Sequence, residues 1–210
     1  MLKTRIAVLV SGMGTNLQAL IDAQERGELH SGEIVLVVSG VEGAYALTRA
    51  ERAGIPTAVC SRKGLGSQEA FEAAICRELE GAGAQLIVMA GFMSILSPDF
   101  TGKYENRIIN IHPSLIPSFC GKGFYGLRVH RAALDYGVKV TGATVHFVNE
   151  IPDGGRIILQ KAVDVLPGDT PESLQRRVME QAEWVLLPRA AELVAARIAQ
   201  EGDQDERIRV

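Results

Sequence analysis

The feature that most restricts the fold is a regular alternation of short β-rich runs with longer amphipathic stretches in the first half of the chain. This alternation is typical of a parallel sheet with helices on both faces. We therefore predict an α/β fold with a Rossmann-like, mostly parallel twisted sheet. The predicted strands are Arg5–Val10, Glu33–Ser39, Thr57–Cys60, Leu86–Met89 and Ile108–His112, and the predicted helices are Asn16–Gln24, Ala44–Ala53, Gln68–Glu80 and Ser97–Thr101.

The regular pattern ends after His112. A Gly- and Pro-rich loop over residues 113–126 is too long for a plain connection, and loops of this kind are usually functional. The remaining predicted elements are two strands, Thr141–Phe147 and Ile157–Val165, and a long C-terminal helix from about Pro171 to Ala199. We expect residues 1–200 to form a single domain and residues 201–210 to form a polar, frayed tail.

Composition narrows the class of partner. The chain has 210 residues, 47% of them apolar, which is enough to bury one sizeable core. Charged residues make up 22% and the net charge is -3, so no broad electrostatic field favours nucleic acid or a membrane surface. The apolar runs are strand-sized, and the N-terminus lacks the features of a signal peptide. We expect a cytoplasmic protein that acts on small molecules, with no nucleic acid or membrane partner, as a monomer or a homodimer.

Three cysteines, Cys60, Cys76 and Cys120, are odd in number and widely spaced, which fits neither a disulfide framework nor a zinc site. We expect free structural thiols and no metal. Cys120 lies within the 113–126 loop, so a nucleophilic role for its thiol is the alternative.

A glycine turn, Ser11-Gly12-Met13-Gly14-Thr15-Asn16, follows the first predicted strand and precedes a helix. Such a turn presents backbone N–H groups that bind anions at the helix N-terminus. Leu17 stands where a dinucleotide fingerprint has its third glycine, and the Gly-Lys-Ser/Thr of a P-loop is absent. A single terminal phosphate therefore fits best, and glycines that serve backbone geometry alone are the alternative.

The strongest chemical signal is Asn110-Ile111-His112-Pro113, at the end of the fifth predicted strand. Alternate residues of a strand share a face, so the Asn110 amide and the His112 imidazole point to one place. Ligand sites of open α/β sheets lie beyond the carboxyl ends of the strands, which is also the edge of the glycine turn. A capped strand end with a structural histidine is the alternative.

Asp153 precedes two glycines between the last two predicted strands. An Asp in this position is most often a turn residue. If it lies beside His112, its carboxylate favours the imidazolium and raises the pKa of that histidine.

Four segments together resemble the phosphoribosylglycinamide formyltransferase family over nearly the whole chain. They are residues 11–16, residues 90–96 (AGFMSIL), residues 110–117 (NIHPSLIP), and His146-Phe147-Val148 with Asp153-Gly154-Gly155. The third segment is shared with other formyl-folate enzymes, and the glycine turn narrows the resemblance. The resemblance implies a formyltransferase-type fold, 10-formyltetrahydrofolate as co-substrate, no metal, and formyl transfer to the amine of 5'-phosphoribosylglycinamide.

The resemblance also implies roles for individual residues. The catalytic set is His112, Asn110 and Asp153. The ribotide is bound by Gly14, Thr15 and Asn16 at its phosphate and by Glu183 at its ribose hydroxyls. The folate is bound by Gln68, Met93, Ser94, Ile95, Leu96 and Asn110. His146 and Thr144 support the site, and plain packing within a strand pair is the alternative for His146.

Three positions depart from the family pattern. Gln68 and Ser94 stand where relatives carry Arg, and Arg128 replaces a common His. Arg offers a carboxylate a bidentate fork that neither Gln nor Ser provides. The resemblance therefore leaves open how the glutamate tail of the folate is held, with backbone amides of residues 94–96 as candidates.

Related activities are the alternatives. Methionyl-tRNA formyltransferases carry a further C-terminal domain and formyltetrahydrofolate hydrolase a further N-terminal one, and we expect neither in this chain. A non-enzymatic nucleotide-binding module on the same fold is the alternative from another class. The combination of Asn110, His112 and Asp153 argues against that module.

Overall fold

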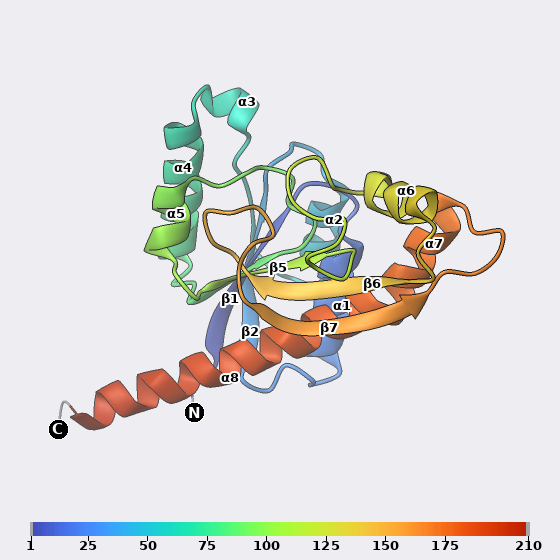
Figure 1. Cartoon of the computed structure of the whole chain (residues 1–210). Coiled ribbons are helices and arrows are strands. Elements are labelled where there is room, and N and C mark those ends of the chain that lie inside the picture. Colours follow the sequence, from blue (N-terminus) through green and yellow to red (C-terminus); the bar gives the residue numbers. More distant parts are fainter. Residues whose placement is uncertain (1, 209–210) are drawn as a thin grey trace.

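The computed structural model describes residues 2–208, with the backbone alone over residues 202–208. Seven strands form one sheet in the order β3-β2-β1-β4-β5-β6-β7. Figure 1 shows the whole chain, with the paired strands β6 and β7 side by side. Strands β1 to β5 pair in parallel, and β6 and β7 are antiparallel to their neighbours. The prediction of a Rossmann-like, mostly parallel sheet is confirmed. The strands are β1 (Thr4–Val10), β2 (Gly32–Ser39), β3 (Thr57–Val59), β4 (Leu86–Met89), β5 (Ile108–His112), β6 (Val140–Phe147) and β7 (Ile157–Asp164).

The strands lie within one residue of their predicted bounds, and in the central strands β1, β2, β4 and β5 apolar residues are buried on both faces of the sheet. In β1, Ile6, Val8 and Val10 pack into one core cluster, whereas Ala7 and Leu9 pack into a second on the opposite face. This near-continuous apolar run is typical of a parallel sheet covered on both sides.

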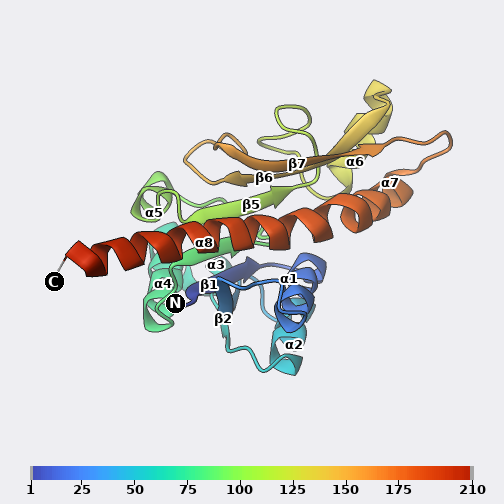
Figure 2. The ribbon, with the colours of Figure 1, turned by 90° about the horizontal axis from the view of Figure 1, so that it is seen from below.

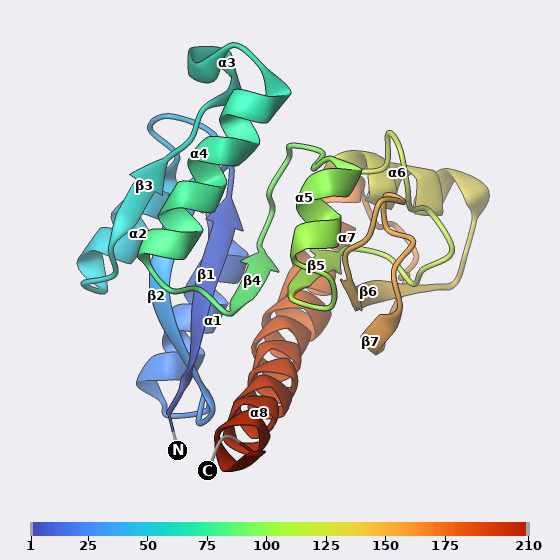
Figure 3. The same ribbon diagram turned by 90° about the vertical axis from the view of Figure 1, so that its left-hand side faces the viewer.

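Helices cover both faces of the sheet, as predicted. Helices α4 (Gln68–Gly81) and α5 (Pro98–Lys103) contribute to one core cluster and lie in front of the sheet in Figure 3. Helices α1 (Thr15–Glu25), α2 (Tyr45–Arg52), α7 (Pro171–Val178) and α8 (Trp184–Ile208) contribute to the other cluster. Figure 2 shows α8 running along the sheet from α7 to the C-terminal end. None of the helices in the described part of the chain is long and apolar enough to cross a bilayer.

Two helices were not predicted, α3 (Arg62–Leu65) and α6 (Leu127–Tyr136). Helix α6 directly follows the glycine-rich loop, whose composition hides the helix start. Its signals are the αL C-cap at Gly137 and a buried stripe that includes Val129 and Ala133. This helix packs beside α7.

The long C-terminal helix differs from the prediction in two respects. A π-helical turn, η1 (Met179–Glu183), separates α7 from α8. Helix α8 also continues to Ile208 and does not end near Ala199 as predicted. Glu201 explains part of this extension, because its carboxylate pairs with Arg107 at 2.8 Å and with Arg197 at 3.4 Å.

Candidate active site

A cleft of about 680 Å³ lies at the carboxyl ends of β1, β4 and β5. The strand order reverses between β1 and β4, and ligands of open α/β sheets bind at such a switch point. The walls of the cleft come from residues 91–96, residues 121–126, residues 148–153 and the cleft face of α7 and η1.

Most of the predicted site residues line this one cleft. They are Asn16, Met93, Ser94, Ile95, Leu96, Asn110, His112, His146, Asp153 and Glu183. Four predicted residues lie outside its lining. Gly14 and Thr15 belong to the adjacent glycine turn, Gln68 lies behind the 91–96 segment, and Thr144 is buried within the sheet.

His112 ends β5 and is held by acceptors on both ring nitrogens. Its Nε2 lies 2.9 Å from the Phe119 carbonyl oxygen, and its Nδ1 lies 3.4 Å from Oδ2 of Asp153. A carbonyl and a carboxylate only accept, so a ring with both nitrogens protonated fits both contacts. The geometry around His112 therefore favours the imidazolium.

Burial opposes this geometry. Desolvation lowers the pKa of His112, the Asp153 charge and the Phe119 carbonyl raise it, and the net pKa lies below the ordinary value. The contact with Asp153 does raise the pKa of His112, as predicted. As a statement about the net pKa of His112 in the unliganded chain the prediction is wrong, because only 4% of the residue is exposed and the charged form loses its hydration.

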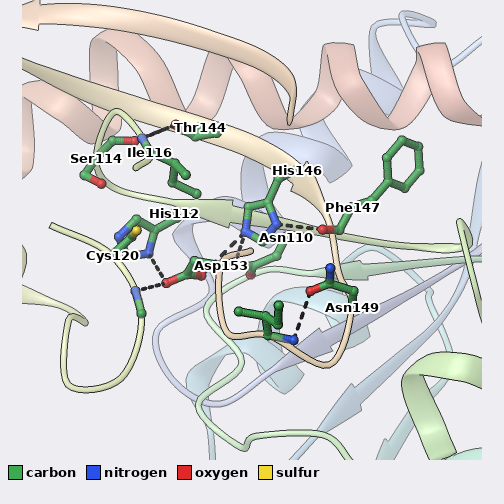
Figure 4. Close-up of polar contacts among 12 residues, drawn as sticks. Asn110, His112, Ser114, Ile116, Cys120, Thr144, His146, Phe147, Asn149 and Asp153 are labelled. Carbon is green, nitrogen blue, oxygen red and sulfur yellow. Dashed lines mark hydrogen bonds and ion pairs between the residues drawn. The ribbon is translucent and has the colours of Figure 1, made fainter. Parts of the chain in front are cut away.

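Asp153 lies between the two histidines (Figure 4). Besides the contact with His112, its Oδ1 lies 3.5 Å from Nε2 of His146, and its Oδ2 accepts the Gly121 N–H at 2.8 Å. Burial raises the pKa of the Asp153 carboxyl, but these partners outweigh burial and lower it below the usual value. Asp153 is therefore a fixed negative charge beside His112.

The backbone around this aspartate is unusual. Asp153 and Phe119, the two contacts of His112, both adopt left-handed backbone with φ of 56° and 50°. Non-glycine residues in this region cost about 1–3 kcal/mol, and such residues cluster at active sites. Gly155 is required because any Cβ there would overlap the Phe147 carbonyl of β6.

His146 and Asn110 face each other across β5 and β6. Nδ2 of Asn110 lies 3.3 Å from Nε2 of His146, and Nδ1 of His146 donates to the Phe147 carbonyl at 2.8 Å. The second contact fixes the plane of the imidazole, which in turn holds the amide of Asn110 at the cleft.

Thr144 supports the loop that follows His112. Its side chain is fully buried, its Oγ1 donates to the Ser114 carbonyl at 2.7 Å, and it accepts the Ile116 N–H at 3.1 Å. These bonds tie the start of the 113–126 loop to β6.

The glycine turn presents the N-terminus of α1 without a side-chain cap. Gly14 occupies the N-cap with φ of 71°, and a Cβ there would lie 2.6 Å from Cβ of Ala46 in α2. Asn16 follows, with its Nδ2 bonded to Oε2 of Glu183 at 2.7 Å. Its Oδ1 is buried and has no hydrogen-bond partner in the described part of the chain.

Glu183 reaches the cleft from the π-helical turn. Gln175, Met179 and Glu183 recur every four residues along the cleft wall, and π turns are frequent at functional sites. Burial raises the pKa of Glu183 to about 6, against the opposing effect of its hydrogen bond with Asn16. The spacing of four residues between Gln175, Met179 and Glu183 is that of one helix face, so it is consistent with Glu183 facing the cleft. It does not reveal the π turn.

The 91–96 segment forms an apolar wall. Met93 and Ile95 line the cleft and are 56% and 64% exposed. Gln68 braces this wall, because its Nε2 donates to the Ile95 carbonyl at 3.0 Å and to Glu72 at 2.6 Å. Sequence reasoning missed Lys122, which is the one Lys or Arg among the described residues that line the cleft.

Cys120 is a free thiol whose Sγ donates to the Pro117 carbonyl at 3.3 Å. Burial and the nearby Asp153 charge both raise the pKa of the thiol. A raised pKa disfavours the thiolate, which is the nucleophilic form. Among the described residues, no group of three or more His, Cys, Asp or Glu is placed to hold a metal ion.

Comparisons with known proteins agree on one family for this chain. A family model described as formyl transferase matches residues 4–190. The chain is 50% identical to the trifunctional purine biosynthetic protein adenosine-3 of Gallus gallus over 96% of its own length but only 19% of that protein. It is 43% identical to phosphoribosylglycinamide formyltransferase of Haemophilus influenzae, over 88% of this chain and 84% of the relative.

Solved structures agree with these matches. Glycinamide ribonucleotide transformylase 1 from Symbiobacterium toebii superposes with a TM-score of 0.86 at 43% identity, over 92% of this chain and 88% of that chain. Phosphoribosylglycinamide formyltransferase from Brucella melitensis gives 0.84 at 44% identity, over 93% and 97% of the two chains.

Proposed function

The chain belongs to the formyl transferase family, and from that premise we propose that it transfers the formyl group of 10-formyltetrahydrofolate to the amine of 5'-phosphoribosylglycinamide. The products are the formylglycinamide ribonucleotide and tetrahydrofolate, a step of de novo purine biosynthesis. The observation that carries the proposal is the meeting of Asn110, His112 and Asp153 in one cleft beside an uncapped helix N-terminus.

The ribotide is bound along the β1 side of the cleft. Its phosphate is held by the glycine turn, where the N-terminus of α1 offers free backbone N–H groups at Thr15 and Asn16. Its ribose hydroxyls donate to Glu183, whose carboxylate has one hydrogen-bond partner, Asn16, in the part of the chain that the structure describes. This placement directs the glycinamide amine toward the carboxyl end of β5.

The folate is bound along the opposite wall. Met93, Ile95 and Leu96 supply apolar contacts, and backbone N–H groups of residues 94–96 supply polar ones. Gln68 contributes indirectly, since its amide fixes the Ile95 carbonyl. The glutamate tail is then left to backbone groups and solvent.

The chemistry is a direct acyl transfer. The ribotide amine attacks the formyl carbon, a tetrahedral species with a negative oxygen forms, and the bond from that carbon to the folate nitrogen breaks. One proton leaves the new ammonium and one reaches the departing nitrogen, so charge and protons balance. No enzyme nucleophile is required, which agrees with the raised pKa of Cys120.

Three side chains lower the barrier. Asn110 donates from its amide to the developing oxyanion, a contact worth about 10²–10³ in rate. His112 stabilises the same oxygen and moves the proton, and such general acid–base catalysis contributes about 10²–10⁴. Asp153 stabilises the positive charge that His112 acquires, and His146 positions Asn110.

The test is a formyl-transfer assay with the purified chain. We expect tetrahydrofolate to form only with glycinamide ribotide as acceptor, and not with water or charged tRNA. Equal tetrahydrofolate release without the ribotide would instead identify a formyltetrahydrofolate hydrolase. No release under any condition would favour a binding module.

Three broader features belong to this proposal. Residues 1–200 act as one catalytic unit, with phosphate binding in the N-terminal half and folate binding in the C-terminal half. The protein works in the cytoplasm, where its three free cysteines stay reduced. It acts as a monomer or a homodimer, which sedimentation of the purified chain decides.

A further inference from the structure

The proposed phosphate site lacks an obvious cation. Asn16 is bonded to Glu183, so a phosphate dianion at the glycine turn lies close to a second negative charge. Lys122, the one Lys or Arg in the described cleft lining, belongs to the loop after β5. A positive charge close to the turn would offset the repulsion between the phosphate and Glu183.

Arg49 of α2 supplies a positive charge at the right place. Its Nε donates to the Met13 carbonyl at 2.8 Å, and its Nη1 donates to Oε1 of Gln18 at 2.9 Å. The guanidinium also lies over the ring of Tyr45, 5.0 Å from the centroid. These contacts come from the glycine turn, from α1 and from α2, and they fix the cation beside the first turn of α1.

The guanidinium of Arg49 keeps donors that its hydrogen bonds to described residues do not use. Of the five N–H groups of a guanidinium, these two bonds use two and leave three. Arg49 and Thr15 both line a second hollow of about 330 Å³, which borders the first turns of α1. Asn16 borders the main cleft with its unpartnered Oδ1. The turn therefore has a cation and a buried polar side chain close to it.

We propose that Arg49 binds the phosphate of the ribotide together with the backbone N–H groups of Thr15 and Asn16. The inference rests on the proposed function and assigns a specificity residue to it. Arg49 selects phosphorylated over unphosphorylated acceptors and takes no part in the formyl-transfer chemistry.

Arg26 provides a matched control. It lines the same hollow as Arg49. Its guanidinium is already paired with the Glu28 carboxylate at 2.7 and 2.9 Å, so its charge is neutralised locally. A general electrostatic effect of the hollow would involve both arginines, whereas the proposed contact involves Arg49 alone.

The experiment measures steady-state formyl transfer by the wild type, Arg49→Gln, Arg49→Lys and Arg26→Gln. We expect Arg49→Gln to raise the KM for glycinamide ribotide about 10- to 100-fold, the range for loss of a hydrogen bond to a charged group. The kcat and the KM for the folate should change less than about 3-fold. Arg49→Lys should recover part of the loss, because it keeps the charge without the fork. Arg26→Gln should match the wild type.

A second acceptor separates phosphate binding from a structural role. With the unphosphorylated glycinamide riboside, the kcat/KM of Arg49→Gln should equal that of the wild type, since no phosphate contact remains to be lost. An equal fall for both acceptors would mean that Arg49 only shapes the turn, and an unchanged ribotide KM would mean that it does not touch the phosphate. Either result overturns the inference.

Failure of the inference and failure of the proposed function are distinguishable. If the wild type transfers no formyl group, the proposed function is wrong. If the wild type is active and Arg49→Gln has an unchanged KM for the ribotide, only the proposed role of Arg49 is wrong. If Arg49→Gln does not fold, Arg49→Lys decides the same question. Its ribotide KM must rise while its rate with the riboside stays unchanged.

Discussion

Replacement of Glu183 by Gln should stabilise the chain and weaken its binding of the ribotide. Burial raises the pKa of Glu183 from 4.5 to about 6, although its hydrogen bond with Asn16 opposes the rise. Because the folded-state pKa lies above the unfolded value, the folded chain binds this proton more tightly. Its stability therefore falls as pH rises through the window from 4.5 to about 6.

The size of the effect follows from that shift. A pKa difference of about 1.5 corresponds to about 2 kcal/mol at about 1.36 kcal/mol per unit. The wild type carries this cost almost in full at about pH 8 and less than about 1 kcal/mol of it at about pH 5. Gln is neutral throughout and similar in shape. Its carbonyl can accept from Asn16, and its amide nitrogen can donate to the Asn16 Oδ1, which has no hydrogen-bond partner in the described part of the chain.

The assay is urea unfolding of the wild type and Glu183→Gln near pH 8 and pH 5. We expect the variant to be more stable by about 2 kcal/mol at the higher pH and by less than about 1 kcal/mol at the lower one. Glu180→Gln, an exposed residue of the same π turn, is the matched control and should change stability little at either pH. A Glu183→Gln variant no more stable than the wild type near pH 8, or one with the same gain at both pH values, would refute the reasoning.

The same substitution should cost affinity. A neutral amide accepts hydrogen bonds from ribose hydroxyls less strongly than a carboxylate, so the KM for the ribotide should rise about 10-fold. The kcat should change little, because Glu183 lies away from the reacting atoms in the proposed complex. An unchanged KM would remove Glu183 from the ribose site without affecting the stability argument.

The remaining predictions concern the centre of the cleft and its surroundings. His112→Ala should lower kcat by about 10²–10⁴ and Asn110→Ala by about 10²–10³ in chains that remain folded, and near-normal turnover would exclude the altered residue from the mechanism. Asp153→Asn keeps the turn chemistry but removes the charge, so an NMR titration should show the His112 midpoint at lower pH, together with reduced kcat; an unchanged midpoint and kcat would leave Asp153 as a turn residue. Cys120→Ser should keep most activity, and a trapped formyl thioester would contradict direct transfer. Burial lowers the pKa of His130 from 6.5 to about 4, so stability should be lost as pH falls through this window. Between these pH values, the unfolding free energy measured in urea should fall by up to about 3 kcal/mol less in His130→Gln than in the wild type. An equal fall in both proteins would show that His130 is not the group responsible.

The strands of this fold could be predicted because their signal is local. In β4, Leu86–Met89, every residue is buried, so the apolar run alone marks the strand. The π turn could not be predicted in this way. The residues of Met179–Glu183 suit an ordinary helix, and the extra residue in the turn depends on packing between α7, α8 and the cleft. Helix α6 was missed because the glycine-rich loop before it masks its start.

The site was predictable where strand geometry decides it. Asn110 and His112 alternate on β5, so their convergence follows from the period of a strand. Arg49 was not predictable, because nothing in its own helix indicates that α2 packs against the glycine turn. The orientation of Gln68 was equally hidden, since its amide bonds to the Ile95 carbonyl behind the cleft wall.

Burial acts on the ionisable groups of the cleft with opposite signs, and the sequence contains no measure of it. It lowers the pKa of His112 and raises that of Glu183, so in both cases it favours the neutral form. Asp153 departs from this trend because two histidines and the Gly121 N–H stabilise its negative charge. The difference lies in the number of hydrogen-bond partners, since among the described residues the Glu183 carboxylate has Asn16 alone. A buried charged side chain with few hydrogen-bond partners in the protein can gain further partners from a bound substrate. By this argument the proposed ribose hydroxyls complete the hydrogen bonding of Glu183. Asp153 already has three protein partners, which fits its proposed role of stabilising the charge on His112.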